Sequence, residues 1–188
     1  MIRLLPLAAA VLSSVLYPRI GNSQVHEKYD RFVDRTVVTL FVLYDSPLFG
    51  ASKEVNVLYY FTGKVQKAQA DTAVFVVKLT SVGTADISAG GWKLADRPPL
   101  YVLVDDTLRL EYQSADRDWN TNMIGRIGYS LDETVAYPIP AVDLVRIAGG
   151  TSVAFKVGRW ERTLKPKELA RIREFVPRLT DTTQHQSR

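Results

Sequence analysis

Oxygen-bearing side chains alternate along one polar segment of the chain, between two stretches with the composition of β-strands. They are Asp116, Asp118, Asn120 and Asn122, and they surround Trp119. Oxygen donors at alternate positions of a curled loop can converge on a hard cation such as Ca²⁺, and an indole ring suits a ligand site with one wet edge. We therefore predict a ligand-binding loop at these five residues. The alternative is an ordinary polar hairpin loop, because Asp and Asn also favour turns.

A calcium loop of the EF-hand type is not predicted here. Such a loop needs a Gly at its sixth position and a bidentate Glu at its twelfth, and this segment has Thr121 and Ile127 in those places. We assign no metal to the segment. Calcium and sugars remain the first ligands to test.

Histidine and cysteine chemistry is nearly absent from the sequence. His26 and His185 are the only histidines, both lie near chain ends that we expect to be mobile, and there is no cysteine. Nucleophilic mechanisms that need an oriented imidazole or a thiol, and zinc sites built from His and Cys, are therefore disfavoured. No glycine-rich phosphate loop or dinucleotide fingerprint is present. We predict no catalytic residue and no cofactor.

One enzymatic alternative stays open, because glycoside hydrolysis needs only two suitably separated carboxylates. Six acidic residues lie at predicted loops or strand ends, namely Asp105, Asp106, Asp116, Asp118, Asp132 and Glu133. The sequence does not indicate that any two of them meet across a cleft. A carboxylate-dependent glycan hydrolase is thus the second hypothesis, behind a non-catalytic domain.

The N-terminus has the layout of a secretory signal peptide. Arg3 is followed by an uncharged stretch over residues 4–17 and by small residues at 21–23. The apolar stretch is shorter than the ~20 residues that span a bilayer, so we predict cleavage near residue 23 and no stable membrane span. The expected organisation is a signal peptide at 1–23, one globular domain at 24–179 and a flexible tail at 180–188. The expected location is the periplasm or the extracellular space.

The mature chain has a small and uneven charge. Residues 24–155 hold 13 basic and 16 acidic side chains, whereas residues 156–188 hold 9 basic and 4 acidic ones. The small total disfavours nucleic acid as a partner. Basic and acidic side chains interleave in the C-terminal segment, which is typical of a solvated helix face. An envelope glycan or protein remains a possible partner, and anionic lipids or glycans are a possible partner of this basic segment.

Apolar periodicity predicts mainly β structure. Dense or alternating apolar residues indicate strands at 36–44, 54–62, 73–82, 100–104, 107–113, 123–130, 151–157 and 159–164. Turns are expected at Asp105-Asp106 and at Gly158. Helices are expected at 140–148 and at 166–176, the second ending before Pro177. For residues 24–35 we predict only a short helical turn or an ordered lead-in.

The elements together predict an α+β, mainly β domain, an antiparallel sheet or sandwich capped by two short C-terminal helices. Our leading functional hypothesis is an exported, non-catalytic binding or structural domain of the cell envelope. It would act through an open sheet surface or through the polar segment around Trp119.

Overall fold

The computed structural model describes residues 25–45, 52–64, 66, 69–83, 94, 96–124 and 128–180. The predicted leader and His185 lie outside these residues, as does the predicted tail beyond Thr180. The described residues form the elements β1 (Val25–Asp30), β2 (Arg35–Asp45), β3 (Ser52–Thr62), β4 (Thr72–Gly83), β5 (Leu100–Val104), β6 (Leu108–Tyr112), β7 (Asp116–Ile124), β8 (Gly128–Pro140), α1 (Ala141–Gly149), β9 (Val153–Val157), β10 (Trp160–Thr163) and α2 (Pro166–Thr180).

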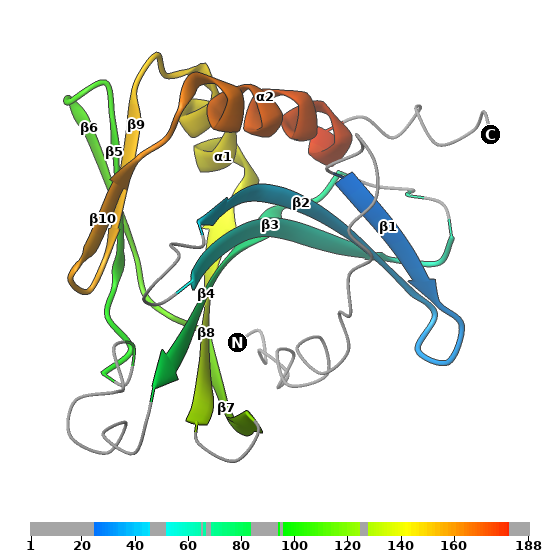
Figure 1. Ribbon diagram of the computed structural model, residues 1–188. Helices are drawn as coiled ribbons and strands as arrows, with labels where there is room; N and C mark the ends of the chain where they lie inside the picture. The colour runs from blue at the N-terminus through cyan, green and yellow to red at the C-terminus, as the bar shows by residue number, and fades with distance from the viewer. Residues whose placement is uncertain are drawn as a thin grey trace.

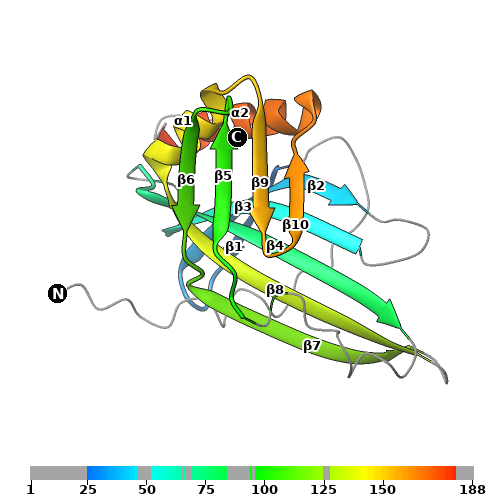
Figure 2. The same ribbon diagram turned by 90° about the vertical axis from the view of Figure 1, so that its left-hand side faces the viewer.

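The strands form two antiparallel sheets. The larger has the order β1-β2-β3-β4-β8-β7 and the smaller the order β10-β9-β5-β6. In Figure 1 the larger sheet is curved, and α2 lies above the convex side of β2 and β3 beside α1. Figure 2 shows the four strands of the smaller sheet side by side in front of the larger one. The mainly β architecture and the antiparallel pairing are therefore as predicted.

The core lies between the two sheets and under the helices. Alternate residues of each central strand point into it, as the period of two requires: Val38 and Leu40 on β2, and Val55 and Val57 on β3, are all buried. The rings of Phe75 on β4 and Phe155 on β9 meet across the two sheets with centroids 5.7 Å apart. Helix α2 adds Leu169, Ile172, Phe175 and Leu179 to the same cluster.

Both tight turns predicted from the sequence are present. Asp105 and Asp106 have φ values of 50° and 55°, and the N–H of Thr107 donates to the carbonyl of Val104. Positive φ at both central positions is what a type I′ turn requires. Gly158 has φ 57° between β9 and β10, a conformation that glycine adopts without the steric cost of a Cβ.

Helix α2 continues past Pro177, where the sequence predicted its end. Pro177 lies in the last turn of α2. A proline there removes one backbone hydrogen bond near the end of the helix and leaves the bonds of the preceding turns intact. Tertiary bonds hold this turn: Tyr59 Oη donates to the carbonyl of Arg178 at 3.0 Å, and Ala70 N donates to that of Leu179 at 3.0 Å. Leu179 is fully buried. Packing and these bonds outweigh the local signal.

Two further segments differ from the prediction. At 24–35 no helical turn forms: residues 25–30 are an edge strand, β1, that pairs with residues 35–40, and a turn leads to β2. The strand predicted at 123–130 is instead the end of β7 and the start of β8, which runs on to Pro140. Pro138 and Pro140 lie beyond the last residue of β8 paired with β7, Ala136. Proline is tolerated at such an unpaired edge, where its missing N–H is not needed.

Candidate functional sites on the two sheets

The segment predicted as a binding loop is strand β7, at the edge of the larger sheet. It pairs with β8 along its whole length, from Asp116 opposite Ala136 to Ile124 opposite Gly128. The loop prediction was therefore wrong, because Asp and Asn are rare in strands and pairing with the long strand β8 overrides that tendency. Whether these residues bind a ligand stays a prediction.

The strand separates Trp119 from the oxygen-bearing side chains. Successive side chains of a strand point to opposite faces, so Asp116, Asp118 and Asn120 share one side and Trp119 belongs to the other. The side chain of Asn122 lies outside the part that the structure describes. The Trp119 ring lies 4.3 Å from the Arg117 guanidinium carbon. Neighbouring oxygen-bearing positions on one face are about 6.6 Å apart along the strand. This spacing opposes convergence on one cation with ligand distances of about 2.4 Å.

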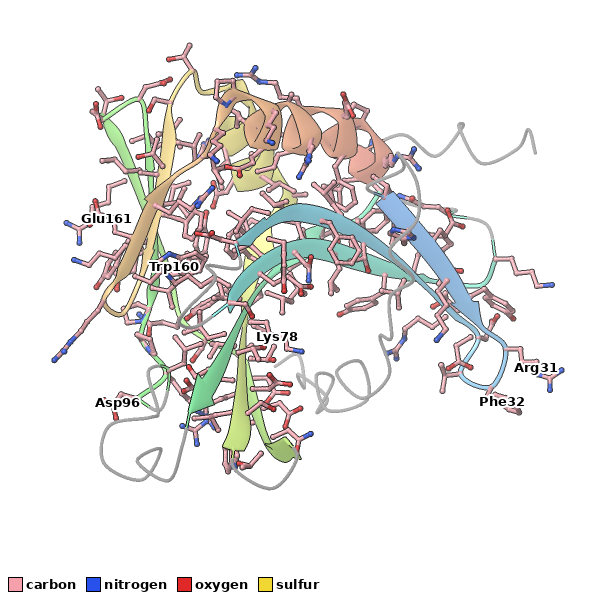
Figure 3. The ribbon with its side chains drawn as sticks, in the orientation of Figure 1. Arg31, Phe32, Lys78, Asp96, Trp160 and Glu161 are labelled. Atoms are coloured by element: carbon pink, nitrogen blue, oxygen red, sulfur yellow. The ribbon has the colours of Figure 1, made fainter. Side chains whose placement is uncertain are left out.

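The oxygen-bearing face of β7 belongs to a larger polar surface on the concave side of the sheet. Register places Glu54, Lys78, Thr134 and Asp118 side by side on β3, β4, β8 and β7. A second row beside it consists of Ser52, Thr80, Asp132 and Asn120. Figure 3 shows Lys78 on the side of β4 away from Trp160, beneath the curve of β2 and β3. We call these two rows, with Tyr44 described next, the polar rows.

Tyr44 extends the first row to a fifth strand because β2 contains a bulge. Phe41 pairs with Asn56, Leu43 with Val55 and Tyr44 with Glu54, so Val42 is the extra residue. A bulge changes which residues point to each face of a strand. Val42 and Leu43 are consequently both buried, and Tyr44 is 59% exposed beside Glu54.

Side chains of the polar rows contact one another. Lys78 Nζ lies 3.5 Å from Asp132 Oδ2, and the neighbouring Asn56 Nδ2 donates to Glu54 Oε1 at 2.6 Å. Two side-chain oxygens of these residues, Asp132 Oδ1 and Asn56 Oδ1, are buried and have no hydrogen-bond partner among the described residues. Leaving a buried acceptor without a hydrogen bond costs about 1–3 kcal/mol. A ligand with a donor group that reached these oxygens would therefore bind more tightly.

The six candidate carboxylates fall into different environments. Asp105 accepts three hydrogen bonds at Oδ1, from Thr151 Oγ1, Thr151 N and Ser152 N. The bond from the Thr151 hydroxyl, followed by those from the two backbone N–H groups, lowers the pKa of Asp105. Its role is to join two loops.

Among the other acidic candidates, Glu133 points into the core and accepts from Leu94 N at 2.8 Å, and Asp106 belongs to the exposed β5–β6 turn. Asp116, Asp118 and Asp132 share the concave face. The structure therefore brings three of the six candidates to one surface.

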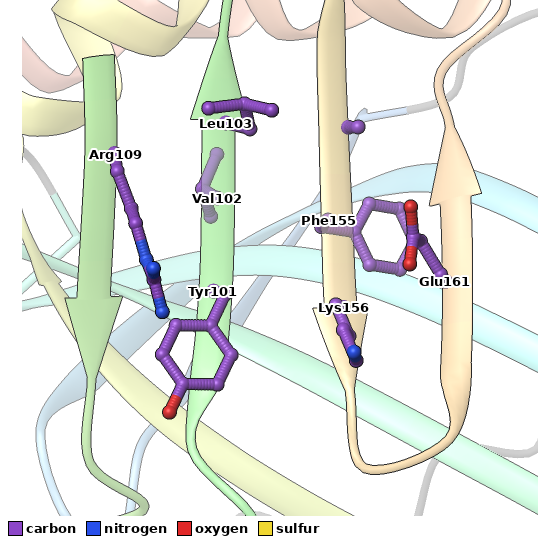
Figure 4. Close-up of a pocket in the computed structure, with 8 residues that line it drawn as sticks. Tyr101, Val102, Leu103, Arg109, Phe155, Lys156 and Glu161 are labelled. Atoms are coloured by element: carbon purple, nitrogen blue, oxygen red, sulfur yellow. The ribbon is translucent and has the colours of Figure 1, made fainter. Parts of the chain in front are cut away.

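A second surface feature is a hollow of about 540 Å³ on the outer face of the smaller sheet. Its floor includes Leu103 and the small Ala154, which register places next to each other. Figure 4 shows Tyr101, Arg109, Lys156 and Glu161 around it, and the Arg109 guanidinium carbon lies 4.8 Å from the Tyr101 ring centroid. This hollow was not predicted from the sequence. The only feature of the sequence that pointed to it was the presence of charged and aromatic residues at outward positions of the predicted strands.

The arginines of the C-terminal basic segment hold the fold together. Arg162 contacts Asp45 at 3.3 Å and Glu168 at 3.0 Å, and Glu168 also accepts from Lys165 N at 2.7 Å, as in a helix capping box. Arg173 donates to the carbonyls of Ala148 and Gly150, where α1 ends and unpaired carbonyls remain. Arg162 and Arg173 are therefore less available to an anionic partner than the sequence suggested, while Lys167 and Glu174 are exposed, as predicted for a solvated helix face.

His26 lies in β1 and not in a mobile tail. Its ring packs edge-on against Phe41 with centroids 5.5 Å apart. Within the described ranges, no group of three or more His, Cys, Asp or Glu residues is arranged to hold a metal ion.

Comparison with protein-family models, curated proteins and solved structures found no match to this chain. Neither α1 nor α2 has the length and apolar character needed to cross a membrane, and the described residues contain no other helix that does. The candidate sites are therefore the two sheet surfaces themselves.

Proposed function

We propose that this protein is an exported, non-catalytic binding domain of the cell envelope, and that the polar rows bind an extended glycan. The observation that carries this proposal is the alignment of Tyr44, Glu54, Lys78, Thr134 and Asp118 across five adjacent strands. With strands about 4.8 Å apart, such a row is roughly 19 Å long.

The chemistry of the polar rows favours a sugar over an apolar ligand. Hydroxyl, carboxylate, amide and ammonium groups supply both donors and acceptors, and an exposed tyrosine provides a flat apolar ring with a polar tip. The concave curvature brings the strands of the sheet around one side of a bound chain. Export is supported by the signal-like composition of residues 1–23.

The binding experiment is an isothermal titration of the protein with a panel of envelope oligosaccharides. We expect Tyr44→Ala and Asp118→Ala each to weaken binding, Tyr44→Ala by about tenfold, which corresponds to about 1.4 kcal/mol. Both side chains are exposed, so the thermal unfolding temperature should change little. The matched control is Tyr101→Ala in the hollow of the smaller sheet.

Each outcome of this titration has a clear meaning. Loss of binding in Tyr101→Ala but not in Tyr44→Ala would move the site to the hollow, and no heat with any oligosaccharide would refute a glycan ligand. Release of new reducing ends would instead favour the second hypothesis, a glycan hydrolase. That hypothesis draws on Asp116, Asp118 and Asp132, which share this face, because glycoside hydrolysis needs two suitably separated carboxylates.

Export is tested separately by N-terminal sequencing of the protein expressed in a bacterium. We expect a product outside the cytoplasm that begins near residue 24. Intact Met1 in the soluble cytoplasmic fraction would contradict export without bearing on the binding surface.

A further inference from the structure

Two apolar side chains project together from the turn between β1 and β2. Phe32 is 84% exposed and the adjacent Val33 is 59% exposed. Figure 3 shows Arg31 and Phe32 at the far end of this hairpin, away from the smaller sheet. Single exposed apolar residues are common, but neighbouring ones at the outermost point of a hairpin are positioned for contact. We call residues 31–34 the β1–β2 tip.

Hydrogen bonds fix the backbone of the β1–β2 tip. Asp30 Oδ1 accepts from Phe32 N at 2.9 Å, and Asp34 Oδ1 accepts from Tyr29 Oη at 2.9 Å. The carbonyl of Asp34 accepts from Gly63 N at 2.9 Å. The turn is therefore tied to β1 and to the end of β3, and its apolar side chains are held outward.

Cations and aromatic rings surround the apolar residues. The Arg31 guanidinium carbon lies 4.9 Å from the Phe32 ring, that of Arg35 lies 5.4 Å from the Tyr60 ring, and Lys64 Nζ lies 5.3 Å from the Tyr29 ring. Residues 27–35 together with Lys64 hold four basic side chains and three acidic ones, namely Lys28, Arg31, Arg35 and Lys64 against Glu27, Asp30 and Asp34. The end of the hairpin therefore has a small net positive charge.

We propose that the β1–β2 tip docks this protein on an anionic lipid surface. Phe32 and Val33 would enter the boundary between head groups and acyl chains, and Arg31, Arg35 and Lys64 would face the lipid phosphates. A membrane interface favours apolar residues at the greatest depth, with tyrosines and long basic side chains nearer the water, and the hairpin end has this order. Two side chains bury far less than the ~800 Å² per partner of a stable protein interface, which argues for lipid over protein.

This inference is independent of the proposed glycan binding. The β1–β2 tip precedes Arg35 at one end of β2, and Tyr44 of the polar rows lies near the other end. The nine residue steps from Arg35 to Tyr44 correspond to about 30 Å along a strand. Lipid contact at the tip therefore leaves the polar rows open.

The chain contains no cysteine, so a cysteine introduced by mutation is the single site for a thiol-reactive label. Val33→Cys is labelled with an environment-sensitive fluorophore and titrated with vesicles of phosphatidylcholine containing one quarter phosphatidylglycerol. Val142→Cys, an exposed position on α1, carries the same label as the control. We expect a blue shift at position 33 only, weakened by high salt and by pure phosphatidylcholine.

Phe32→Ser in the labelled Val33→Cys protein should raise the lipid concentration for half-maximal signal by about tenfold or more, as expected when a buried Phe side chain is lost. A circular dichroism melt confirms that this exposed substitution leaves the fold intact. An unchanged signal at position 33, or an equal signal at 142, would overturn the proposal. So would a shift that rises with protein concentration in the absence of lipid, since it would identify a second copy of the chain as the partner.

Discussion

Replacing Phe175 by alanine removes the ring that joins α2 to the larger sheet. Phe175 is fully buried, and its ring meets that of Tyr59 on β3 edge-on, with centroids 5.6 Å apart and planes at 62°. The same tyrosine donates to the carbonyl of Arg178, so the aromatic contact and the end of α2 share one anchor. Loss of the ring leaves a cavity next to this anchor.

The expected cost follows from complete burial. Phe→Ala substitutions in cores destabilise by about 3–5 kcal/mol, and an edge-to-face aromatic pair contributes about 0.5–1.5 kcal/mol beyond its buried area. We therefore expect the upper part of that range for Phe175→Ala. Total stabilities of single domains are about 5–15 kcal/mol, so this one change removes a large part of the total.

The assay is equilibrium unfolding in urea followed by circular dichroism. For a urea m-value of about 2 kcal/mol/M, a loss of 4 kcal/mol lowers the midpoint by about 2 M. Glu174→Ala, at the exposed neighbouring position, should change stability by less than about 0.5 kcal/mol. Equal midpoints for Phe175→Ala and wild type would refute the docking of α2 against the core.

Two more predictions concern a close contact and a buried hydroxyl. A Cβ at Gly150 would clash with Val104 Cγ1, whereas one at Gly149 would have no heavy atom within 4 Å. In thermal melts Gly150→Ala should therefore cost about 1–3 kcal/mol, and Gly149→Ala should be neutral or stabilising. Burial, more than the nearby Glu27 charge, raises the pKa of Tyr59 to about 12. The free energy of unfolding should therefore fall as the pH rises from about 10 to 12, because the unfolded tyrosine ionises first. This fall should be smaller in Tyr59→Phe, and an equal fall in both proteins would contradict the assignment to Tyr59.

Periodicity and turn chemistry predicted the parts of this fold that depend on local sequence. The alternation around Leu108 and Leu110 located β6, the adjacent Asp105 and Asp106 located its turn, and Gly158 located the β9–β10 turn. In each case the residue type matches the backbone conformation directly. The mainly β class followed from the number of such segments.

Predictions failed where distant pairing decides the structure. The polar residues of β7 have weak strand propensity, yet β8 provides a partner along their whole length. No strand was predicted directly after Ser130, yet β4 pairs with β8 as far as Pro140. Likewise, the sequence around Pro177 does not reveal that Tyr59 and Ala70 will bind the carbonyls beyond it.

The candidate site could be predicted only in part for the same reason. Asp118 was identified, but its neighbours Thr134, Lys78 and Glu54 come from three other strands and are adjacent only through the sheet register. Trp119 was grouped with Asp118 because they are adjacent in sequence. In a strand, adjacency in sequence places side chains on opposite faces.

The bulge at Val42 links the core to the proposed binding surface. A one-residue change of register exchanges the two faces of a strand, so β2 without the bulge would bury Tyr44 and turn Leu43 toward the concave side. Helix α2 holds this irregular backbone, since Arg171 Nη1 donates to the Val42 carbonyl at 2.8 Å, and Arg162 fixes Asp45 one residue past Tyr44. The basic residues of the C-terminal segment therefore support the concave surface indirectly: they hold the end of β2 in the conformation that presents Tyr44 beside Glu54.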